Sequence, residues 1–180
     1  CTLFAVARSG LRFSAALRAE LDFLEPVLAS PDVAMSGGVL LKDGRTRPVV
    51  RLGLGDRALV VKRYNLKNLR HALARFWRPS RAWHSWREAH RLGFYGIATP
   101  RPLALIEERV GPLRRRAFLV TEHCPGVDLL THLSPDEKPE GDVALAIISL
   151  FTALHDLRIS HGDLKATHLL WHEGRIFLID

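Results

Sequence analysis

The chain has 180 residues, of which 47% are hydrophobic and 25% charged, and its formal net charge is +7 at pH 7. No apolar run approaches the roughly 20 residues that a membrane-spanning helix requires, and no convincing signal peptide opens the sequence. The two cysteines, Cys1 and Cys124, show no sign of pairing. We therefore expect a globular protein in the reducing setting of the cytoplasm.

The first thirty residues, 1–30, are predicted to form a helical extension ahead of the main fold. A helix is expected over Ser14–Leu28, because leucines recur there at helical spacing and Ser14 is a suitable N-cap. Pro26 indicates a bend in this helix or an earlier end.

From residue 31 to residue 121 the pattern is mainly that of β-strands. Short apolar runs separated by turn-like sequences predict three antiparallel strands, over Val39–Leu41, Val49–Leu52 and Ala58–Val61. The rest of this region is predicted to form a basic helix over 66–77 and a second helix over 80–93 that Pro79–Ser80 opens. Two more strands are predicted over 102–106 and 116–121.

Residues 122–180 are predicted to begin with a linker, 122–126, and to continue as helices. Val143–Leu157 is expected to be a long buried helix, followed by a turn and a short β-hairpin that ends at Asp180. The order of elements indicates an α+β protein in which a β-rich lobe is joined to a helical lobe. A cleft between two lobes is where a small molecule commonly binds.

Basic residues are concentrated in one part of the chain. Between Arg57 and Arg101 there are eleven Lys or Arg residues and one acid, Glu88, so the segment carries +10 and the rest of the chain −3. The plain interpretation is a solvated face. The alternative is an anionic partner, either nucleic acid or an anionic lipid surface, to which each nearby basic residue could contribute about 1 kcal/mol.

Two aspartates carry the clearest chemical signal. Asp163 lies in a turn after the long helix, and Asp180 follows seventeen residues later at the end of a short apolar strand. An ATP-dependent phosphotransferase of the protein-kinase fold needs this arrangement. Asp163 is therefore the predicted catalytic base, which accepts the proton of the attacking hydroxyl, and Asp180 is a predicted ligand of Mg²⁺. A turn-capping aspartate is the plain alternative for Asp163.

Phosphoryl transfer also needs a lysine that reaches the phosphates and an acid that orients it. Lys62 closes the apolar run 58–61, and strand alternation can direct it into the cleft. Glu88 is predicted to be its partner, since no other acid lies between Asp56 and Glu107. The alternative for Glu88 is a surface ion pair with a neighbouring arginine, Arg87 or Arg91.

Three more residues of the Asp163 turn have predicted roles. Lys165 is expected to steady the transferred phosphate. His168 occupies the position where a kinase of this fold usually carries a metal-binding asparagine, and it is predicted either to bind the metal or to hydrogen-bond Asp163. His161, like His155 on the preceding helix, is expected to be structural.

Five segments in this order resemble the bacterial lipopolysaccharide kinase family, the Kdo and heptose kinases of the lipopolysaccharide core, which form a branch of the protein-kinase-like fold. The resemblance runs from about Val33 to Asp180. Its segments are Leu59–Tyr64, Trp86–Ala89, Gly96–Pro102, Phe118–Glu122 and His161–Lys165. Members of this family tolerate a histidine at the position of His168. The resemblance implies a kinase N-lobe over 31–121, and a hinge with the first part of a C-lobe over 122–180.

The resemblance further implies ATP as phosphate donor, Mg²⁺ or Mn²⁺ as cofactor, and a sugar hydroxyl of the inner core as acceptor. Glu122 and Cys124 would meet adenine through their backbone groups, and Asp128 would lie near the ribose. The glycine-rich pattern of ordinary protein kinases is absent before Lys62. Gly44 is the candidate for the turn over the phosphates.

Three functions follow from these residues. The first is a lipopolysaccharide core-sugar kinase that contacts the anionic inner face of the cytoplasmic membrane, with no nucleic-acid partner. The second is a Ser/Thr protein kinase, because the transfer motifs do not identify the acceptor. The third is a pseudokinase or a module that binds anionic surfaces, favoured by His168 and by the missing glycine pattern. The opening Cys1 and the end at Asp180 lead us to expect a fragment with a truncated C-lobe.

Overall fold

The structure is a computed structural model that describes residues 15–44, 47–65, 79–110, 113–133 and 141–179. The chain forms two compact units, one of residues 1–87 and 102–123, the other of residues 88–101 and 124–180. The division falls within helix α5 (Arg81–Phe94), between Arg87 and Glu88. The predicted boundaries instead kept 88–101 with the strands on either side of it.

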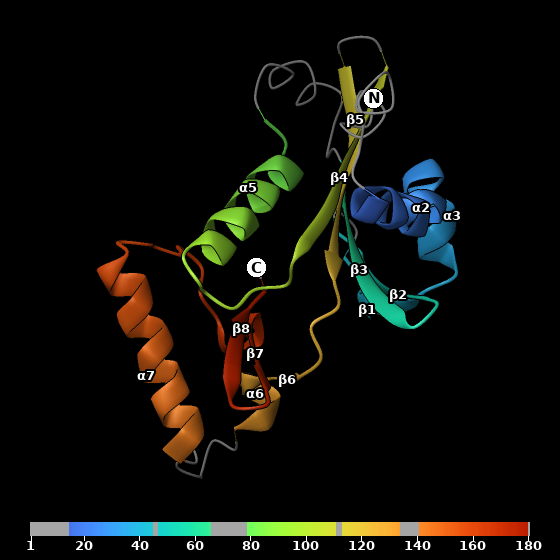
Figure 1. Ribbon diagram of the computed structural model, residues 1–180. Helices are drawn as coiled ribbons and strands as arrows, with labels where there is room; N and C mark the ends of the chain where they lie inside the picture. Colours follow the sequence, from blue (N-terminus) through green and yellow to red (C-terminus); the bar gives the residue numbers. More distant parts are fainter. Residues whose placement is uncertain (1–14, 45–46, 66–78, 111–112, 134–140, 180) are drawn as a thin grey trace. The chain divides into compact units, whose positions relative to one another are not determined.

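The first unit contains a five-stranded antiparallel sheet in the order β1-β2-β3-β5-β4 (Figure 1). Its strands are β1 (Val39–Lys42), β2 (Val49–Leu54), β3 (Arg57–Tyr64), β4 (Pro102–Val110) and β5 (Leu113–Glu122). All five lie where the sequence predicts strands, but β4 and β5 are longer than their apolar runs. The ladder continues into charged sequence, where Arg116 and Glu108 form a two-pronged cross-strand ion pair at 2.7 and 3.0 Å.

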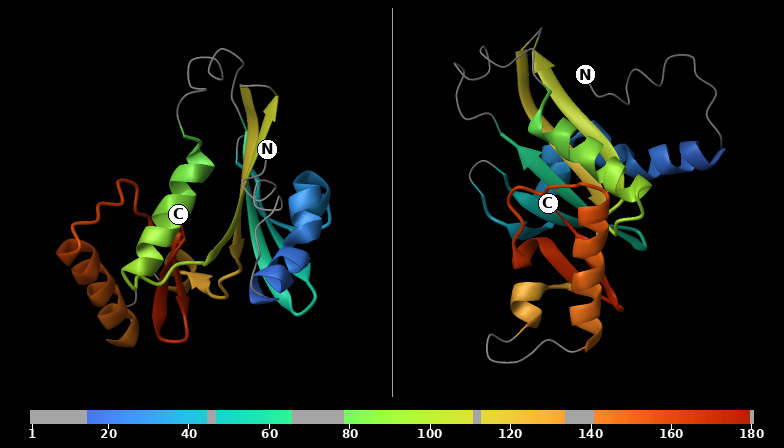
Figure 2. Two further views of the ribbon diagram at one scale, coloured as in Figure 1. Left: turned by 45° about the horizontal axis from the view of Figure 1, so that its top comes forward. Right: turned by 90° about the vertical axis from the view of Figure 1, so that its left-hand side faces the viewer.

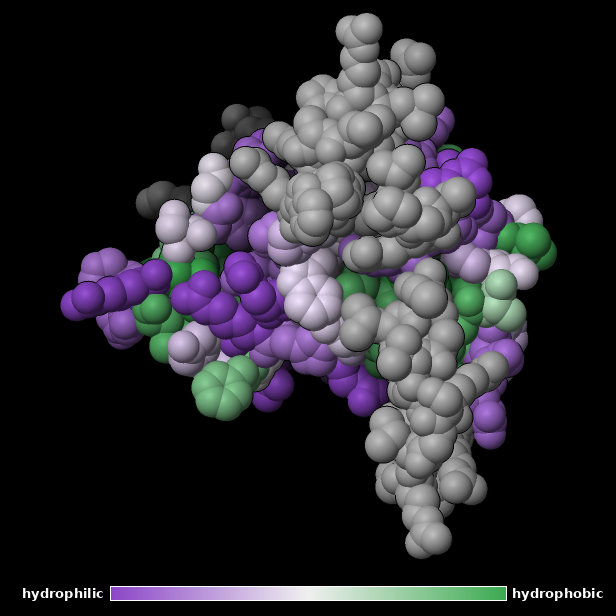
Figure 3. Space-filling view, turned by 90° about the horizontal axis from the view of Figure 1, so that it is seen from above, coloured by the Kyte–Doolittle hydropathy of each residue, from purple (hydrophilic) through white to green (hydrophobic). Residues whose placement is uncertain are grey.

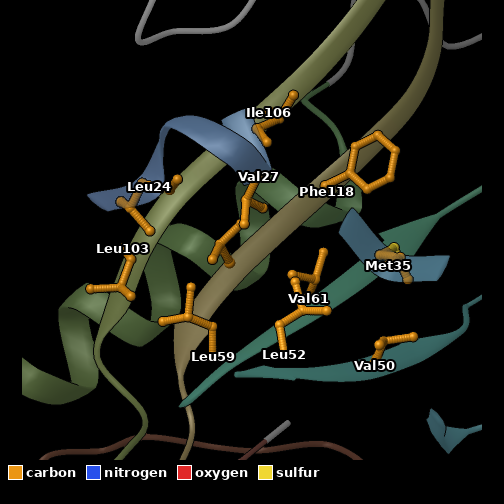
Figure 4. Close-up of a cluster of buried hydrophobic side chains, with 12 residues drawn as sticks. Leu24, Val27, Met35, Val50, Leu52, Leu59, Val61, Leu103, Ile106 and Phe118 are labelled. Atoms are coloured by element: carbon orange, nitrogen blue, oxygen red, sulfur yellow. The ribbon is translucent and has the colours of Figure 1, made fainter. Parts of the chain in front are cut away.

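One face of this sheet packs against the N-terminal helices, α2 (Ala15–Ala29) and α3 (Pro31–Ser36). Alternate residues of the central strands point to this face, and leucine, valine and methionine side chains of the helices meet them (Figure 4). Leu24 and Val27 are almost completely buried. The N-terminal helix is therefore part of the core of the first unit.

Pro26 neither ends nor shortens α2, which continues to Ala29. An interior proline costs a helix about 3 kcal/mol. Burial of each leucine or valine side chain stabilises the folded state by roughly 1.5–3 kcal/mol. Leu24 and Val27, on either side of the proline, are thus enough to offset the lost hydrogen bond.

The opposite face of the sheet is covered by the first half of α5, as Figures 1 and 2 show. Ala82 of the helix packs with Leu105 and Ala117 of the sheet, and two half-buried tryptophans flank this contact. The helix begins where Pro79–Ser80 was predicted to open it, and Ser80 caps it, because its Oγ accepts a hydrogen bond of 2.9 Å from the amide of Trp83. The predicted helix over 66–77 lies outside the described residues.

The second unit combines a three-stranded antiparallel sheet, β6-β7-β8, with short and long helices. Its elements are β6 (Val127–Asp128), α6 (Leu129–His132), α7 (Gly141–Asp156), the 3₁₀ turn η1 (Ala166–His168), β7 (Leu169–His172) and β8 (Arg175–Leu178). The predicted long helix and hairpin are present. The two-residue strand β6 and the four-residue helix α6 were not predicted, because segments so short carry no periodicity.

Helix α7 is not fully buried, and the prediction of a buried helix is wrong in this respect. Val143, Leu150 and Leu154 face the core of the second unit. Three further apolar side chains remain 47–63% exposed, those of Leu145, Ile148 and Phe151. Its apolar residues extend around the helix, because six of the ten lie on the stripe that packs against this core and the other four lie outside it.

Candidate active site

The predicted catalytic loop lies between α7 and β7 and begins with a tight turn. The amide of Asp163 donates a 3.0 Å hydrogen bond to the carbonyl of His161, which closes a γ-turn around Gly162. Gly162 has φ of +75°, a backbone conformation that side-chain-bearing residues rarely adopt. The turn leaves the Asp163 carboxylate 73% exposed and therefore accessible to a substrate.

Three of the predicted site residues meet in this loop. Lys165 Nζ donates to Asp163 Oδ2 at 3.1 Å, so the ammonium group contacts one of the two carboxylate oxygens. His168 Nδ1 lies 3.1 Å from the carbonyl oxygen of Asp163. Because a carbonyl can only accept, Nδ1 must carry a proton in this hydrogen bond, which leaves Nε2 as the nitrogen that could offer a lone pair.

This hydrogen bond bears on both predicted roles of His168. It makes the contact with Asp163 that the sequence offered as one alternative. A metal-binding histidine, however, characteristically donates its other ring N–H to a carbonyl or carboxylate, so the contact also prepares Nε2 for a metal. The carbonyl of His168 accepts from the amide of Ile179 at 3.0 Å. Asp180, the other predicted metal ligand, lies outside the described residues.

Two residues that the sequence did not assign to the site hold the end of β8. Ala98 accepts a 2.9 Å hydrogen bond from the amide of Leu178, and Thr99 Oγ1 donates to the carbonyl of Leu178 at 2.8 Å. The segment after α5 therefore fixes the strand that leads to Ile179. The motif Gly96–Pro102 entered the prediction only through resemblance, and nothing local in it indicates this distant contact.

Lys62 lies on β3, where it faces Val49 of β2 and Leu119 of β5. Strand alternation places it on the face opposite to the buried Val61, the face that α5 covers. Glu88 is on α5 in the second unit, and its Oε2 lies 3.4 Å from Arg91 Nη1. The ion pair of Glu88 with Arg91, which the sequence offered as the alternative, is therefore present. The pairing of Glu88 with Lys62 stays a prediction.

The predicted linker begins with Glu122, whose carboxylate lies 3.1 Å from Arg57 Nη2. The amide of His123 donates to the carbonyl of Ala58 at 2.9 Å, so the sheet ladder extends one residue beyond β5. Burial and the nearby Arg51 lower the pKa of His123. The predicted backbone contacts of Glu122 and Cys124 with adenine are untested.

Cys124 is a buried free thiol whose burial raises its pKa to about 11. Since the thiolate is the reactive form, Cys124 should resist alkylation by iodoacetamide at pH 7.5 in the folded protein and react readily in 8 M urea. Peptide mass mapping separates its labelling from that of Cys1. Equal labelling in both states would show that the thiol is not buried.

Asp128, predicted to lie near ribose, is the N-cap of α6. Its Oδ1 accepts a 3.0 Å hydrogen bond from the amide of Thr131, and its Oδ2 accepts one of 2.9 Å from the Thr131 hydroxyl. Both carboxylate oxygens are therefore held in a fixed direction at the start of the second unit's helical part.

Gly126 lets the linker pass close to β7. Its φ is +139°, and a Cβ there would lie 2.7 Å from the carbonyl oxygen of Trp171. Gly126→Ala is expected to lower the free energy of unfolding by about 1–3 kcal/mol, because the backbone conformation is nearly restricted to glycine and the obstacle is backbone. Urea denaturation would measure this.

Gly93→Ala is the matched control. Gly93 lies in α5 with open space around its Cα, so alanine should stabilise the helix by up to about 1 kcal/mol. Similar effects of the two substitutions would contradict the close approach at Gly126.

Gly44 lies in the connection from β1 to β2. Its carbonyl accepts a 3.0 Å hydrogen bond from the amide of Arg47, and a Cβ on it would lie 2.9 Å from the Arg47 carbonyl oxygen. The turn therefore requires glycine for steric reasons. Arg45 and Thr46, the other residues of the candidate phosphate turn, lie outside the described residues.

The basic segment is partly engaged by acids of the chain itself. Arg57 pairs with Glu20 as well as Glu122, and Arg63 pairs with Asp32 at 2.9 Å. Hydrophilic residues predominate on the described surface in the space-filling view, and hydrophobic ones form smaller, separate patches (Figure 3). A solvated, internally paired face thus accounts for part of the charge run.

Within the described ranges, no cluster of three or more His, Cys, Asp and Glu side chains is arranged to hold a metal ion. The same ranges contain no helix with the length and apolar character needed to cross a bilayer. His168 and the undescribed Asp180 remain the predicted metal ligands.

Comparison with known proteins identifies the family. Residues 43–180 match the family model described as the lipopolysaccharide kinase (Kdo/WaaP) family, and the chain belongs to this family. A curated relative, the 3-deoxy-D-manno-octulosonic acid kinase of Actinobacillus succinogenes, is 33% identical over 91 residues. That match covers 51% of this chain and 38% of the relative, so the chain matches well under half of the relative's length.

A solved structure described as WaaP in complex with acyl carrier protein shares the fold. Its TM-score is 0.56 at 22% identity, and the match covers 88% of this chain and 67% of that one. The predicted family and the α+β, protein-kinase-like fold are thereby confirmed.

Proposed function

We propose that this chain carries the nucleotide-binding part and the catalytic loop of an ATP-dependent kinase that phosphorylates a sugar hydroxyl of the lipopolysaccharide inner core. The observation that carries the proposal is the contact of Lys165 and His168 with Asp163 in one exposed loop, within the segment that matches the family. A solvent-accessible carboxylate beside an ammonium group suits a base that handles a hydroxyl next to a phosphate.

In this proposal Asp163 orients the acceptor hydroxyl and takes its proton on the oxygen that Lys165 leaves available. Lys165 stabilises the transferred phosphoryl group as its charge shifts towards the acceptor. Lys62, oriented by Glu88, binds the phosphates of ATP, and the Gly44 turn lies over them. The backbone of Glu122 and Cys124 contacts adenine, and Asp128 lies near the ribose.

His168 and Asp180 are the proposed ligands of the divalent cation, which when bound would neutralise charge on the phosphates. The donor set fits such a cation in part. A carboxylate suits Mg²⁺, whereas an imidazole nitrogen is accepted more readily by Mn²⁺. The orientation of the His168 ring by the Asp163 carbonyl is the feature of this chain that supports the assignment.

Membership of this family and the similarity to a 3-deoxy-D-manno-octulosonic acid kinase support a sugar acceptor, 3-deoxy-D-manno-octulosonic acid, over a protein acceptor. We place the enzyme in the cytoplasm, with peripheral contact to the anionic inner face of the membrane through the basic segment. Such contact should weaken as salt concentration rises.

Phosphate transfer from radiolabelled ATP tests the function. With Mg²⁺ or Mn²⁺ present, label should enter a lipid acceptor that bears 3-deoxy-D-manno-octulosonic acid, and it should not enter casein or histone. Label in the proteins alone would replace the sugar kinase by a protein kinase. No transfer with either metal would favour a binding module.

A further inference from the structure

Both ends of strand β3 carry an arginine that reaches the N-terminal helices. Arg57 is the first residue of the strand, and its guanidinium binds Glu20 of α2 through two hydrogen bonds of 3.0 Å. Arg63, near the other end, binds Asp32 of α3 at 2.9 Å. The two arginine side chains are equally exposed, at 31%. They differ in what else lies beside them.

Arg57 has a second acidic partner, Glu122, which is the last residue of β5 and the first residue of the linker. Its guanidinium also lies over the ring of Phe23, 4.2 Å from the ring centre. Hydrogen bonds and charge from both glutamates raise the pKa of Arg57, the bond to Glu20 most of all. The guanidinium is therefore held on three sides, by two residues of α2 and by the first residue of the linker.

We propose that Arg57 is a positioning residue for the nucleotide site: it ties the Glu122 end of the linker to α2, so that the N-terminal helix sets the path of the backbone at 122–124. This inference rests on the proposed function, in which that backbone contacts adenine. The backbone hydrogen bond from His123 to Ala58 lies next to this ion pair, because His123 follows Glu122 and Ala58 follows Arg57 in the chain. It therefore holds the start of the linker to the same end of β3.

Arg57 attracts two carboxylates and also offsets the repulsion between them. Glu20 and Glu122 both approach one guanidinium within 3.1 Å. Without that cation their carboxylates would repel across a short distance, and the linker end would move away from α2. The planar guanidinium also fixes the direction from which each carboxylate approaches, whereas the ammonium group of a lysine at the same position would not.

The experiment compares Arg57→Met with the matched control Arg63→Met. Both remove an arginine from the same strand and the same face of the sheet, but Arg63 is six residues, about 20 Å, along the strand from the linker end. Thermal unfolding first shows that each variant is folded. Hydrogen exchange of the amides at 122–124 is then measured without nucleotide, and KM for ATP and kcat are measured with Mg²⁺.

Arg57→Met should speed exchange at His123 and Cys124 and raise KM for ATP by about three- to thirtyfold while kcat changes little. Arg63→Met should leave both unchanged although its stability falls by a similar amount. Arg57→Lys and Glu20→Gln, which are milder, should fall between wild type and Arg57→Met.

Unchanged exchange at 122–124 in Arg57→Met, or the same change in Arg63→Met, would overturn the positioning role. A different outcome is possible, in which Arg57→Met exchanges faster than the wild type at 122–124 but the wild type itself binds no ATP. That outcome would overturn the proposed function, and with it the link between Arg57 and nucleotide.

Discussion

Replacing Asp163 by alanine is expected to lower kcat for phosphate transfer by about a hundred- to ten-thousandfold. The substitution removes the carboxylate that would take the proton of the acceptor hydroxyl. It also removes the group that Lys165 contacts at 3.1 Å, so the lysine loses its fixed direction. The affinity for ATP should stay close to that of wild type, because Asp163 is proposed to contact the acceptor. Initial rates and equilibrium binding of ATP would measure the two effects separately.

Stability provides the internal check on this prediction. The Asp163 side chain is mostly exposed, and loss of an exposed ion pair rarely costs more than about 1 kcal/mol. Asp156→Ala is a suitable control, since Asp156 is an exposed aspartate at the end of α7 whose side chain contacts His155. It should leave the rate unchanged. Substantial activity in Asp163→Ala would rule out Asp163 as the base.

Lys62→Met should reduce kcat/KM by about a hundred- to a thousandfold, the effect typical of removing one preorganised charge from developing negative charge. Methionine keeps most of the length of the side chain and its apolar stem, so β3 should retain its pairing with β2 and β5. The loss should appear both in KM for ATP and in kcat. Steady-state kinetics at varied ATP would resolve the two.

Lys42→Met is the matched control, because Lys42 is an exposed lysine at the end of β1 in the same sheet. It changes the net charge by the same amount, and we expect wild-type kinetics. Equal losses in the two variants would indicate a general effect of charge on ATP binding, with no specific role for Lys62.

Features that depend on nearby residues were predictable from the sequence. The hairpins of the first unit follow from apolar runs separated by glycine-containing turns, and each predicted strand is present. Asp163, Lys165 and His168 lie within six residues in a tight loop, so their contact needed no knowledge of the tertiary fold. The same holds for the Ser80 cap of α5, whose partner is three residues away.

Features that depend on distant contacts were not predictable. The N-terminal helix is an extension by sequence, but it packs on the sheet and reaches Arg57, 37 residues beyond Glu20. Glu122 was assigned to the nucleotide site, and it also meets Arg57, a residue 65 positions earlier in the chain that the pairing of β3 with β5 brings beside it. Periodicity likewise could not show which side of α7 would stay exposed, because apolar residues surround that helix.

The uncovered side of α7 has a practical consequence for work with this chain in solution. The helix exposes three apolar side chains at spacings of three residues, those of Leu145, Ile148 and Phe151. Residues at this spacing are neighbours on a helix, so they form an apolar strip in contact with water. Such a strip binds hydrophobic resins and dyes and promotes association at high protein concentration. Purification should therefore favour low concentration and mild non-ionic detergent, and glutamine at these positions is the first change to make for a well-behaved sample.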